Sequence, residues 1–253
     1  MPRSARRLAG PPLPEGPVIL GIETGGMHLG LSLWRLPTHM GADQHEWHLL
    51  ESASMRLGHQ HARTLLAQAD AMLARQELKP SDVDCVGVGR GPGGFTGVRV
   101  GMASALGMGI GLDAAVWPVD SLAVLAMHAA GSPDVVIPII DARKHEVYGA
   151  AYRVPLGSAP ERLAPPIVGP REQVVAQLSA QTGAQRPLVF GSGSVVYGGG
   201  TEVPPHWHVP CASHTGWLAA LAWEESGRER GAAPTIDPAY VRPSDAELQA
   251  QKG

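Results

Sequence analysis

The chain has 253 residues, of which 44% are hydrophobic and 17% charged, and its formal net charge is -3. This balance excludes a disordered or acidic-tail protein, and the lack of basic excess argues against a chain that grips nucleic acid by itself. Two cysteines, Cys85 and Cys211, are too few for a disulfide framework or a thiolate zinc site, so a reducing cytoplasm is expected.

The first half of the chain is predicted to contain three strands, a helix, a buried strand and a second helix. Residues 1–16 are Pro-rich and lack an apolar stretch of secretory length, so a flexible extension is expected there. No segment approaches the roughly 20 apolar residues of a membrane span. Apolar periodicity places the elements at Val18–Ile22, Leu29–Trp34, Glu46–Ser54, His61–Leu78, Val83–Gly89 and Thr96–Leu112.

The start of the second half of the chain resembles the start of the first half. In each half an apolar strand ends in a carboxylate, Glu23 or Asp141, and a short turn leads to another strand. This pattern fits a duplicated domain, and it equally fits two ordinary hairpins with turn carboxylates. Strands are predicted at Val135–Ile140, Glu146–Arg153 and Leu188–Gly191, helices at Arg171–Ala180 and Ser213–Glu229, and loops at Pro155–Pro170 and Gly198–Pro205.

The strongest local signal is the glycine-rich segment from Gly89 to Gly101, between a buried strand and a helix. Backbone N–H groups at a helix N-terminus suit a phosphate or a carboxylate. Glycines four residues apart, such as Gly97 and Gly101, instead favour close approach of another backbone. Both interpretations stay open. The G-x-G-x-x-G match is weak evidence for a dinucleotide, and no Lys-Ser/Thr pair follows as in a Walker A loop.

This segment resembles the signature of a known family. Residues 91–101, Gly-Pro-Gly-Gly-Phe-Thr-Gly-Val-Arg-Val-Gly, are similar to the G-P-G-S-F-T-G-x-R-x-G of the bacterial TsaB (YeaZ) family. Ile22-Glu23-Thr24 resembles the family's I-D-T, and Asp141-Ala142-Arg143 followed by Glu146-Val147-Tyr148 resembles its D-A-R…E-V-Y. Residues 238–242, Pro-Ala-Tyr-Val-Arg, match its terminal P-x-Y-x-R. The resemblance runs in order over nearly the whole chain.

The resemblance implies a two-lobed α/β fold of the actin and sugar-kinase (ASKHA) type, with duplicated ribonuclease-H-like lobes. The lobes would span 17–112 and 113–253, with the last helix free to pack on the first lobe. The implied role is that of a non-catalytic subunit that pairs with and activates the paralogue TsaD, together with the ATPase TsaE. That complex forms threonylcarbamoyladenosine in the anticodon loop of tRNAs that read codons starting with A. Contact with tRNA would go through the complex, with a homodimer as an alternative pairing and no membrane involved.

The resemblance also implies two loops for an anion or a nucleotide. They comprise Glu23, Thr24, Gly91, Gly93, Gly94, Thr96, Asp141 and Arg143. Glu23 replaces the family's Asp, Gly94 replaces its Ser, and no glycine lies between Asp141 and His145. One of the two phosphate cradles of a working ATPase is therefore missing, so no cofactor of the chain's own is expected, and ATP or ADP would bind only in the complex.

Catalytic and metal-binding residues are not expected. Ser121 and Leu125 occupy the positions where a related paralogue carries a His-x-x-x-His metal pair, and leucine binds no metal. The pairs His59/His61 and His206/His208 are expected to be ordinary surface or hydrogen-bonded histidines. The alternatives are a nucleotide-binding enzyme, which needs both phosphate loops, and a metallopeptidase-like hydrolase of the glycoprotease family, which needs a ligand set.

Two apolar helix stripes predict a partner interface. They comprise Leu65, Leu66, Met72 and Leu73 on the first helix and Met102, Leu106 and Ile110 on the second. Together they offer more apolar area than one lobe easily covers, and an exposed remainder would mark a partner surface. The alternative is that both stripes pack on the protein's own sheet.

Overall fold

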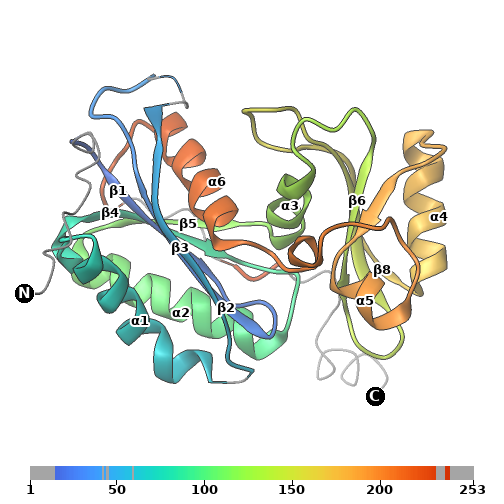
Figure 1. Ribbon diagram of the computed structural model, residues 1–253, viewed down its shortest axis with the longest axis horizontal. Helices are drawn as coiled ribbons and strands as arrows, with labels where there is room; N and C mark the ends of the chain where they lie inside the picture. The colour runs from blue at the N-terminus through green and yellow to red at the C-terminus, as the bar shows by residue number, and fades with distance from the viewer. Residues whose placement is uncertain (1–14, 42, 44–45, 59, 232–236, 240–253) are drawn as a thin grey trace, which may run out of the picture.

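A computed structural model describes residues 15–41, 43, 46–58, 60–231 and 237–239. These residues form two lobes, each built on its own β-sheet (Figure 1). The predicted extension 1–16 lies almost wholly outside the described residues, as do Tyr240, Val241 and Arg242 of the terminal motif.

The first lobe contains a five-stranded sheet in the order β3-β2-β1-β4-β5. Strands β1, β2 and β3 are antiparallel neighbours, whereas β4 runs parallel to β1 and β5 parallel to β4. Every residue of β1 is buried, because helices cover both faces of the sheet. The strands are β1 (Val18–Glu23), β2 (His28–Arg35), β3 (His48–Arg56), β4 (Val83–Gly89) and β5 (Ala115–Val119).

Helices α1 (His61–Arg75) and α2 (Phe95–Leu112) lie on one face of this sheet, and α6 (Ala212–Glu225) lies on the other (Figure 1). Helix α1 ends three residues before the predicted end, because Glu77 takes a left-handed conformation with φ 59°. Length and composition would let α2 cross a membrane, but this is weak evidence. A helix that packs on its own sheet passes the same test, and α2 contacts β4, β5 and α1.

The second lobe repeats the first in abbreviated form. Its sheet has the order β8-β7-β6-β9, with β6, β7 and β8 antiparallel and β9 parallel to β6. This is the arrangement of the first four strands of the first lobe, so the predicted duplication and the two-lobed α/β fold class are confirmed. The elements are β6 (Val136–Asp141), β7 (Val147–Arg153), β8 (Glu161–Gly169), α4 (Arg171–Thr182), β9 (Leu188–Phe190) and α5 (Ser192–Tyr197).

Short elements join the lobes and their strands. Helix α3 (Ser121–Ala126) and the 3-10 turn η3 (Met127–Ala129) follow β5, and α3 packs against β6, β7 and α6. The 3-10 turn η2 (Pro80–Asp82) precedes β4, and η4 (Pro205–His208) leads from the second lobe back to α6. Helices α3 and α5 were not predicted, since six residues are too few to display a helical period.

Two sequence expectations are corrected. The segment Pro155–Pro170 was expected to be a loop, but most of it forms β8 at the edge of the second sheet. An edge strand tolerates Pro165 and Pro166, and the pairing of β7 with β8 shifts register beside them. The boundary at residue 112 is also wrong for the first sheet, because β5 beyond it pairs with β4 in that sheet.

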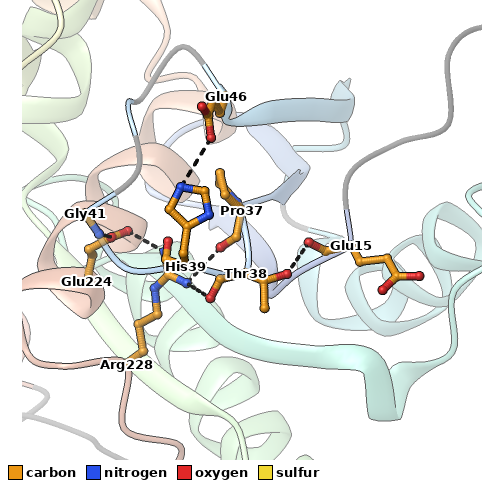
Figure 2. Close-up of polar contacts among 8 residues, drawn as sticks. All are labelled: Glu15, Pro37, Thr38, His39, Gly41, Glu46, Glu224 and Arg228. Atoms are coloured by element: carbon orange, nitrogen blue, oxygen red, sulfur yellow. Dashed lines mark hydrogen bonds and ion pairs between the residues drawn. The ribbon is translucent and has the colours of Figure 1, made fainter.

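The end of α6 is fastened to the connection between β2 and β3 (Figure 2). The Arg228 guanidinium donates to the carbonyls of Pro37 at 2.8 Å and Thr38 at 3.1 Å, and it lies 2.9 Å from a carboxylate oxygen of Glu224. Glu224 in turn accepts from the Gly41 N–H at 2.7 Å. The last helix is therefore part of the first lobe, although it follows the second lobe in sequence.

Candidate functional site

Glu23 ends β1 and places its carboxylate inside the first lobe, where the residue is only 3% exposed. The carboxylate accepts from the Gly25 N–H at 3.0 Å and from the hydroxyls of Ser121 at 3.3 Å and Thr215 at 3.5 Å. Burial raises the pKa of Glu23, while these donors oppose the shift. A side chain on Gly89 would collide with this carboxylate, so β4 needs glycine there.

Thr24 fixes the first turns of α2 on the turn between β1 and β2. Its hydroxyl donates to the Gly97 carbonyl at 2.9 Å. A Cβ on Gly97 would collide with the Thr24 carbonyl, and a Cβ on Gly101 with the Thr24 hydroxyl. These two glycines let the helix backbone touch the turn, as the close-packing interpretation predicted.

The glycine loop that precedes α2 is held by the same turn. The Gly94 N–H donates to the Gly25 carbonyl at 2.6 Å, and a Cβ on Gly93 would lie 2.7 Å from that oxygen. The Gly91 carbonyl accepts from the Ser121 N–H at 2.8 Å. Thr96 stays exposed on the first turn of α2. The structure thus brings Glu23 and Thr24 together with the glycine loop, and a direct anion contact there stays a prediction.

The second predicted loop follows β6 and has its own hydrogen bonds. Asp141 accepts from the Arg143 N–H at 2.9 Å and from the Tyr197 hydroxyl at 2.8 Å. Arg143, Lys144 and His145 all have positive φ, at 62°, 53° and 63°. Three consecutive residues other than glycine in this region are unusual and cost about 1–2 kcal/mol each. Asp141 is hydrogen-bonded to Ser192, Arg143 and Tyr197, all of which belong to the second lobe, whereas Glu23 is bonded within the first.

An ion pair that the sequence did not reveal joins the two lobes. Asp120, directly after β5, caps α3 by accepting from the Leu122 N–H at 2.8 Å, and it lies 2.6 Å from the Arg162 guanidinium of β8. Burial raises the pKa of Asp120, and the Arg162 charge opposes that shift. Tyr152 lies beneath, 5.9 Å from the guanidinium, and burial raises its phenol pKa far above the usual value. Arg162 lies in the segment expected to be a loop, so no sequence signal pointed to it.

Ser121 and Leu125, which stand where a paralogue carries a metal-binding histidine pair, have structural contacts in this protein. The Ser121 hydroxyl contacts Glu23, and Leu125 is fully buried in the core. His61 is buried rather than on the surface, with Nε2 3.1 Å from the Gly26 carbonyl, and His59 lies outside the described residues. Within the described ranges, no group of three or more His, Cys, Asp or Glu side chains could hold a metal ion.

The predicted interface residues divide into core and surface, which corrects the prediction. Four of the seven are at most 5% exposed and belong to the core of the first lobe, so they cannot contact a partner: Leu65, Met72, Leu73 and Met102. Helical periodicity explains this, because these positions face the sheet. Leu106 is half-buried, whereas Leu66 is 58% and Ile110 85% exposed.

Two glycines lie beside the exposed apolar residues on α2. Gly107 and Gly111 flank Ile110 on α2, and nothing lies within 4 Å of the place where either Cβ would stand. These two glycines therefore differ from Gly97 and Gly101, which pack inward. We call Leu66, Leu106, Gly107, Ile110 and Gly111 the outer helix face; it lies on α1 and α2, on the side of the first sheet opposite α6 (Figure 1).

The chain is similar in sequence to proteins of tRNA modification. A family model described as TsaD, tRNA N6-adenosine threonylcarbamoyltransferase, matches residues 56–166. The tRNA threonylcarbamoyladenosine biosynthesis protein TsaB of Haemophilus influenzae is 41% identical over 90 residues. That alignment spans 35% of this chain and 38% of the relative, so well under two thirds of the relative's length is covered.

Two solved structures from Pseudomonas aeruginosa align along nearly the whole chain. One, described as similar to the peptidase YeaZ, has a TM-score of 0.71 at 27% identity and covers 89% of this chain and 100% of its own. The other, YeaZ, has a TM-score of 0.65 at 25% identity and covers 90% of this chain and 99% of its own. The two-lobed architecture is therefore shared along the full length of both.

Proposed function

Because the chain belongs to the TsaB/YeaZ family, we propose that it is a non-catalytic subunit in the biosynthesis of threonylcarbamoyladenosine in tRNA. Its partners in this proposal are a TsaD paralogue, which it activates, and the ATPase TsaE. Contact with tRNA goes through the assembled complex. The chain itself provides a folded surface for the paralogue and transfers no group.

The observation that carries the non-catalytic role is the closed packing of the glycine loop. A phosphate cradle presents free backbone N–H groups to its ligand. Here the Gly94 N–H already donates to the Gly25 carbonyl, and the turn between β1 and β2 fills the space above Gly93 and Gly97. The Glu23 carboxylate is likewise engaged by internal donors. Because these groups are already hydrogen-bonded within the lobe, the first lobe needs no nucleotide in order to fold. This supports the non-catalytic role.

The outer helix face is the surface that we propose for the paralogue. Ile110 presents an almost fully exposed side chain, and the open positions at Gly107 and Gly111 let a partner helix approach closely. Leu66 extends this apolar surface onto α1. A second copy of this chain would use the same face when the paralogue is absent, and the two pairings would then compete.

The test is a binding and activity comparison with the TsaD paralogue. Wild type, Leu66→Glu and Ile110→Glu are measured for binding by calorimetry and for support of threonylcarbamoyl transfer to tRNA. A charge buried in the contact loses its water, so we expect each variant to lose at least about tenfold in affinity. The control is Leu156→Glu, because Leu156 is 81% exposed but lies in the second lobe.

All three substituted side chains are largely exposed, so the folded state is expected to survive in each variant. Wild-type binding by both helix variants would show that the interface lies elsewhere. Group transfer by the chain without the paralogue would overturn the non-catalytic role.

A further inference from the structure

Four histidines from separate parts of the chain meet where the lobes join. His128 lies in η3, directly after α3, and His206 and His208 lie in η4. His214 lies in the first turns of α6. Helix α3 packs on the second sheet, whereas α6 packs on the first. The contact between these elements therefore connects one lobe to the other.

His128 is the centre of this histidine cluster. Its ring centroid lies 4.8 Å from that of His214 and 5.7 Å from that of His206, both in edge-to-face geometry. The indole of Trp207 stacks on His128 at 5.9 Å and also contacts Phe190 at 5.3 Å. The rings thus pack as apolar groups do, which an imidazole does best when it is neutral.

Hydrogen bonds join two rings of the cluster to backbone groups, one at Val209 in the connection 203–211 and the other at Gly191 after β9. His128 Nε2 lies 3.0 Å from the Val209 carbonyl, and His208 Nδ1 lies 3.1 Å from both the nitrogen and the oxygen of Gly191. Nδ1 of His214 is buried and has no hydrogen-bond partner. A proton added there would find no acceptor.

The surroundings oppose positive charge. The titratable groups that face His128 are His206 and His208 of η4 and His214 of α6, and no carboxylate among the described residues forms an ion pair with His128 or His214. Burial and the neighbouring histidines lower the pKa of His128. Burial, with His128 beside it, lowers the pKa of His214 to about 4. These histidines do not form a metal site, since no described group has the required arrangement.

We propose that the histidine cluster is a proton-operated joint between the lobes. Uptake of protons by His128 and His214 separates η3 from the connection 203–211 and from the start of α6, and the second lobe loosens on the first. At neutral pH both rings are uncharged and the joint is closed. Acidification opens it without unfolding either sheet. This property concerns the chain alone and is independent of the partner proposed above.

The expected dependence of joint opening on pH follows from the linkage between proton binding and opening. A histidine with a folded pKa near 4 and an open-state pKa near 6.5 binds a proton mainly when the joint opens. Well between those pH values the opening constant therefore rises by close to tenfold for each unit of acidification, and less steeply near either pKa. From pH 6.5 to pH 5 we expect opening of the joint to increase about 15-fold through His214 alone, and further through His128.

Hydrogen exchange followed by mass spectrometry on the full chain measures this opening. Rates for the connection 203–211 are corrected for the intrinsic pH dependence of exchange and compared at pH 7.5, 6.5 and 5. We expect protection of this segment to fall by at least the stated factor, while α4, which contains no histidine, keeps its protection. An unchanged opening constant between pH 7.5 and 5, or an equal loss in α4, would overturn the proposal.

Substitutions identify the groups that titrate. His128→Gln and His214→Gln each remove one proton-binding site, so the pH slope of opening should become shallower by up to one proton. His48→Gln is the matched control, because His48 is exposed on β3, and it should retain the wild-type slope. A wild-type slope in both folded cluster variants would show that other groups are responsible. If a variant fails to fold, the imidazole resonances of the wild-type protein decide, and titration of the His128 and His214 rings near pH 6.5 would refute the joint.

Discussion

The carboxylate of Asp120 and the guanidinium of Arg162 lie 2.6 Å apart, although the first follows the last strand of one sheet and the second lies on the edge strand of the other. Their partners extend the link, since Asp120 also caps α3 and Arg162 lies above Tyr152. The Asp120 side chain is 10% exposed and that of Arg162 43% exposed. The ion pair therefore helps to fix the orientation of the two lobes, while the Arg162 side chain stays in contact with water.

We expect Arg162→Ala to destabilise the protein by about 1–3 kcal/mol at pH 7, because it removes the ion-pair partner of the buried Asp120 carboxylate. The loss should shrink at low pH, since Asp120 then takes up a proton and no longer needs the guanidinium. Urea denaturation at pH 7 and pH 4 measures both effects. Arg153→Ala is the control, because Arg153 and Glu161 form an ion pair with both side chains more than half exposed, and a change within about 0.5 kcal/mol is expected.

Glu23→Gln should stabilise the protein at pH 8. The folded-state pKa of Glu23 is raised above the unfolded value by burial, so folding favours the protonated form. Stability contributed by this group is therefore lost as the pH rises through the folded pKa, and glutamine avoids that loss. The advantage should disappear below about pH 4.5, where the unfolded chain is protonated too. Destabilisation by Glu23→Gln at pH 8 would show that the Ser121 and Thr215 hydroxyls bind the ionised form more strongly than burial opposes it.

Two glycines of α2 should respond oppositely to alanine. Gly97→Ala places a methyl group against the Thr24 carbonyl, and we expect a loss of about 1–3 kcal/mol. Gly107→Ala meets open space in the same helix, so a gain of about 0.4–1 kcal/mol from reduced chain entropy is expected. Thermal and urea unfolding of both variants measure the contrast. Equal effects of the two substitutions would mean that helix propensity, rather than contact with the turn, determines the outcome.

Neighbouring leucines on α1 should separate stability from partner binding. Leu65 is fully buried, and Leu65→Ala should cost about 2–5 kcal/mol. Leu66→Ala should leave stability within about 0.5 kcal/mol and weaken binding to the TsaD paralogue. Denaturation and calorimetry are the two measurements. Substantial destabilisation by Leu66→Ala would place this side chain in the core and remove it from the outer helix face.

Much of the fold could be predicted because its signals are local. The uninterrupted apolar run of β1 and the glycine-to-helix transition at Phe95 fixed those elements to within one residue. The strand β8 was missed, because Pro165 and Pro166 resemble loop residues unless the strand is known to lie at an edge. Adjacent leucines at 65 and 66 made the stripe on α1 too wide, and only packing on the sheet decides which of them is buried.

Some contacts of the candidate site could likewise be predicted from the sequence, and others could not. Glu23 and the glycine loop could be expected to meet, because β1 and β4 are parallel neighbours whose carboxyl ends share one edge of the sheet. The pairing of Asp120 with Arg162 could not be predicted, since it depends on the packing of one lobe against the other. The contact of His128 with His214 depends on the same packing, across 86 positions of sequence.

The position of α6 also affects how the protein is made. All five strands of the first sheet have been synthesised once the ribosome passes Val119, but the helix that covers one face follows about a hundred residues later. At roughly 5–20 residues per second that delay lasts on the order of 5–20 s. During this time Ile19, Cys85 and Ala115 lack the cover that Ala220 and Trp223 later provide. The nascent first lobe thus exposes an apolar face to solvent for as long as the second lobe is being synthesised.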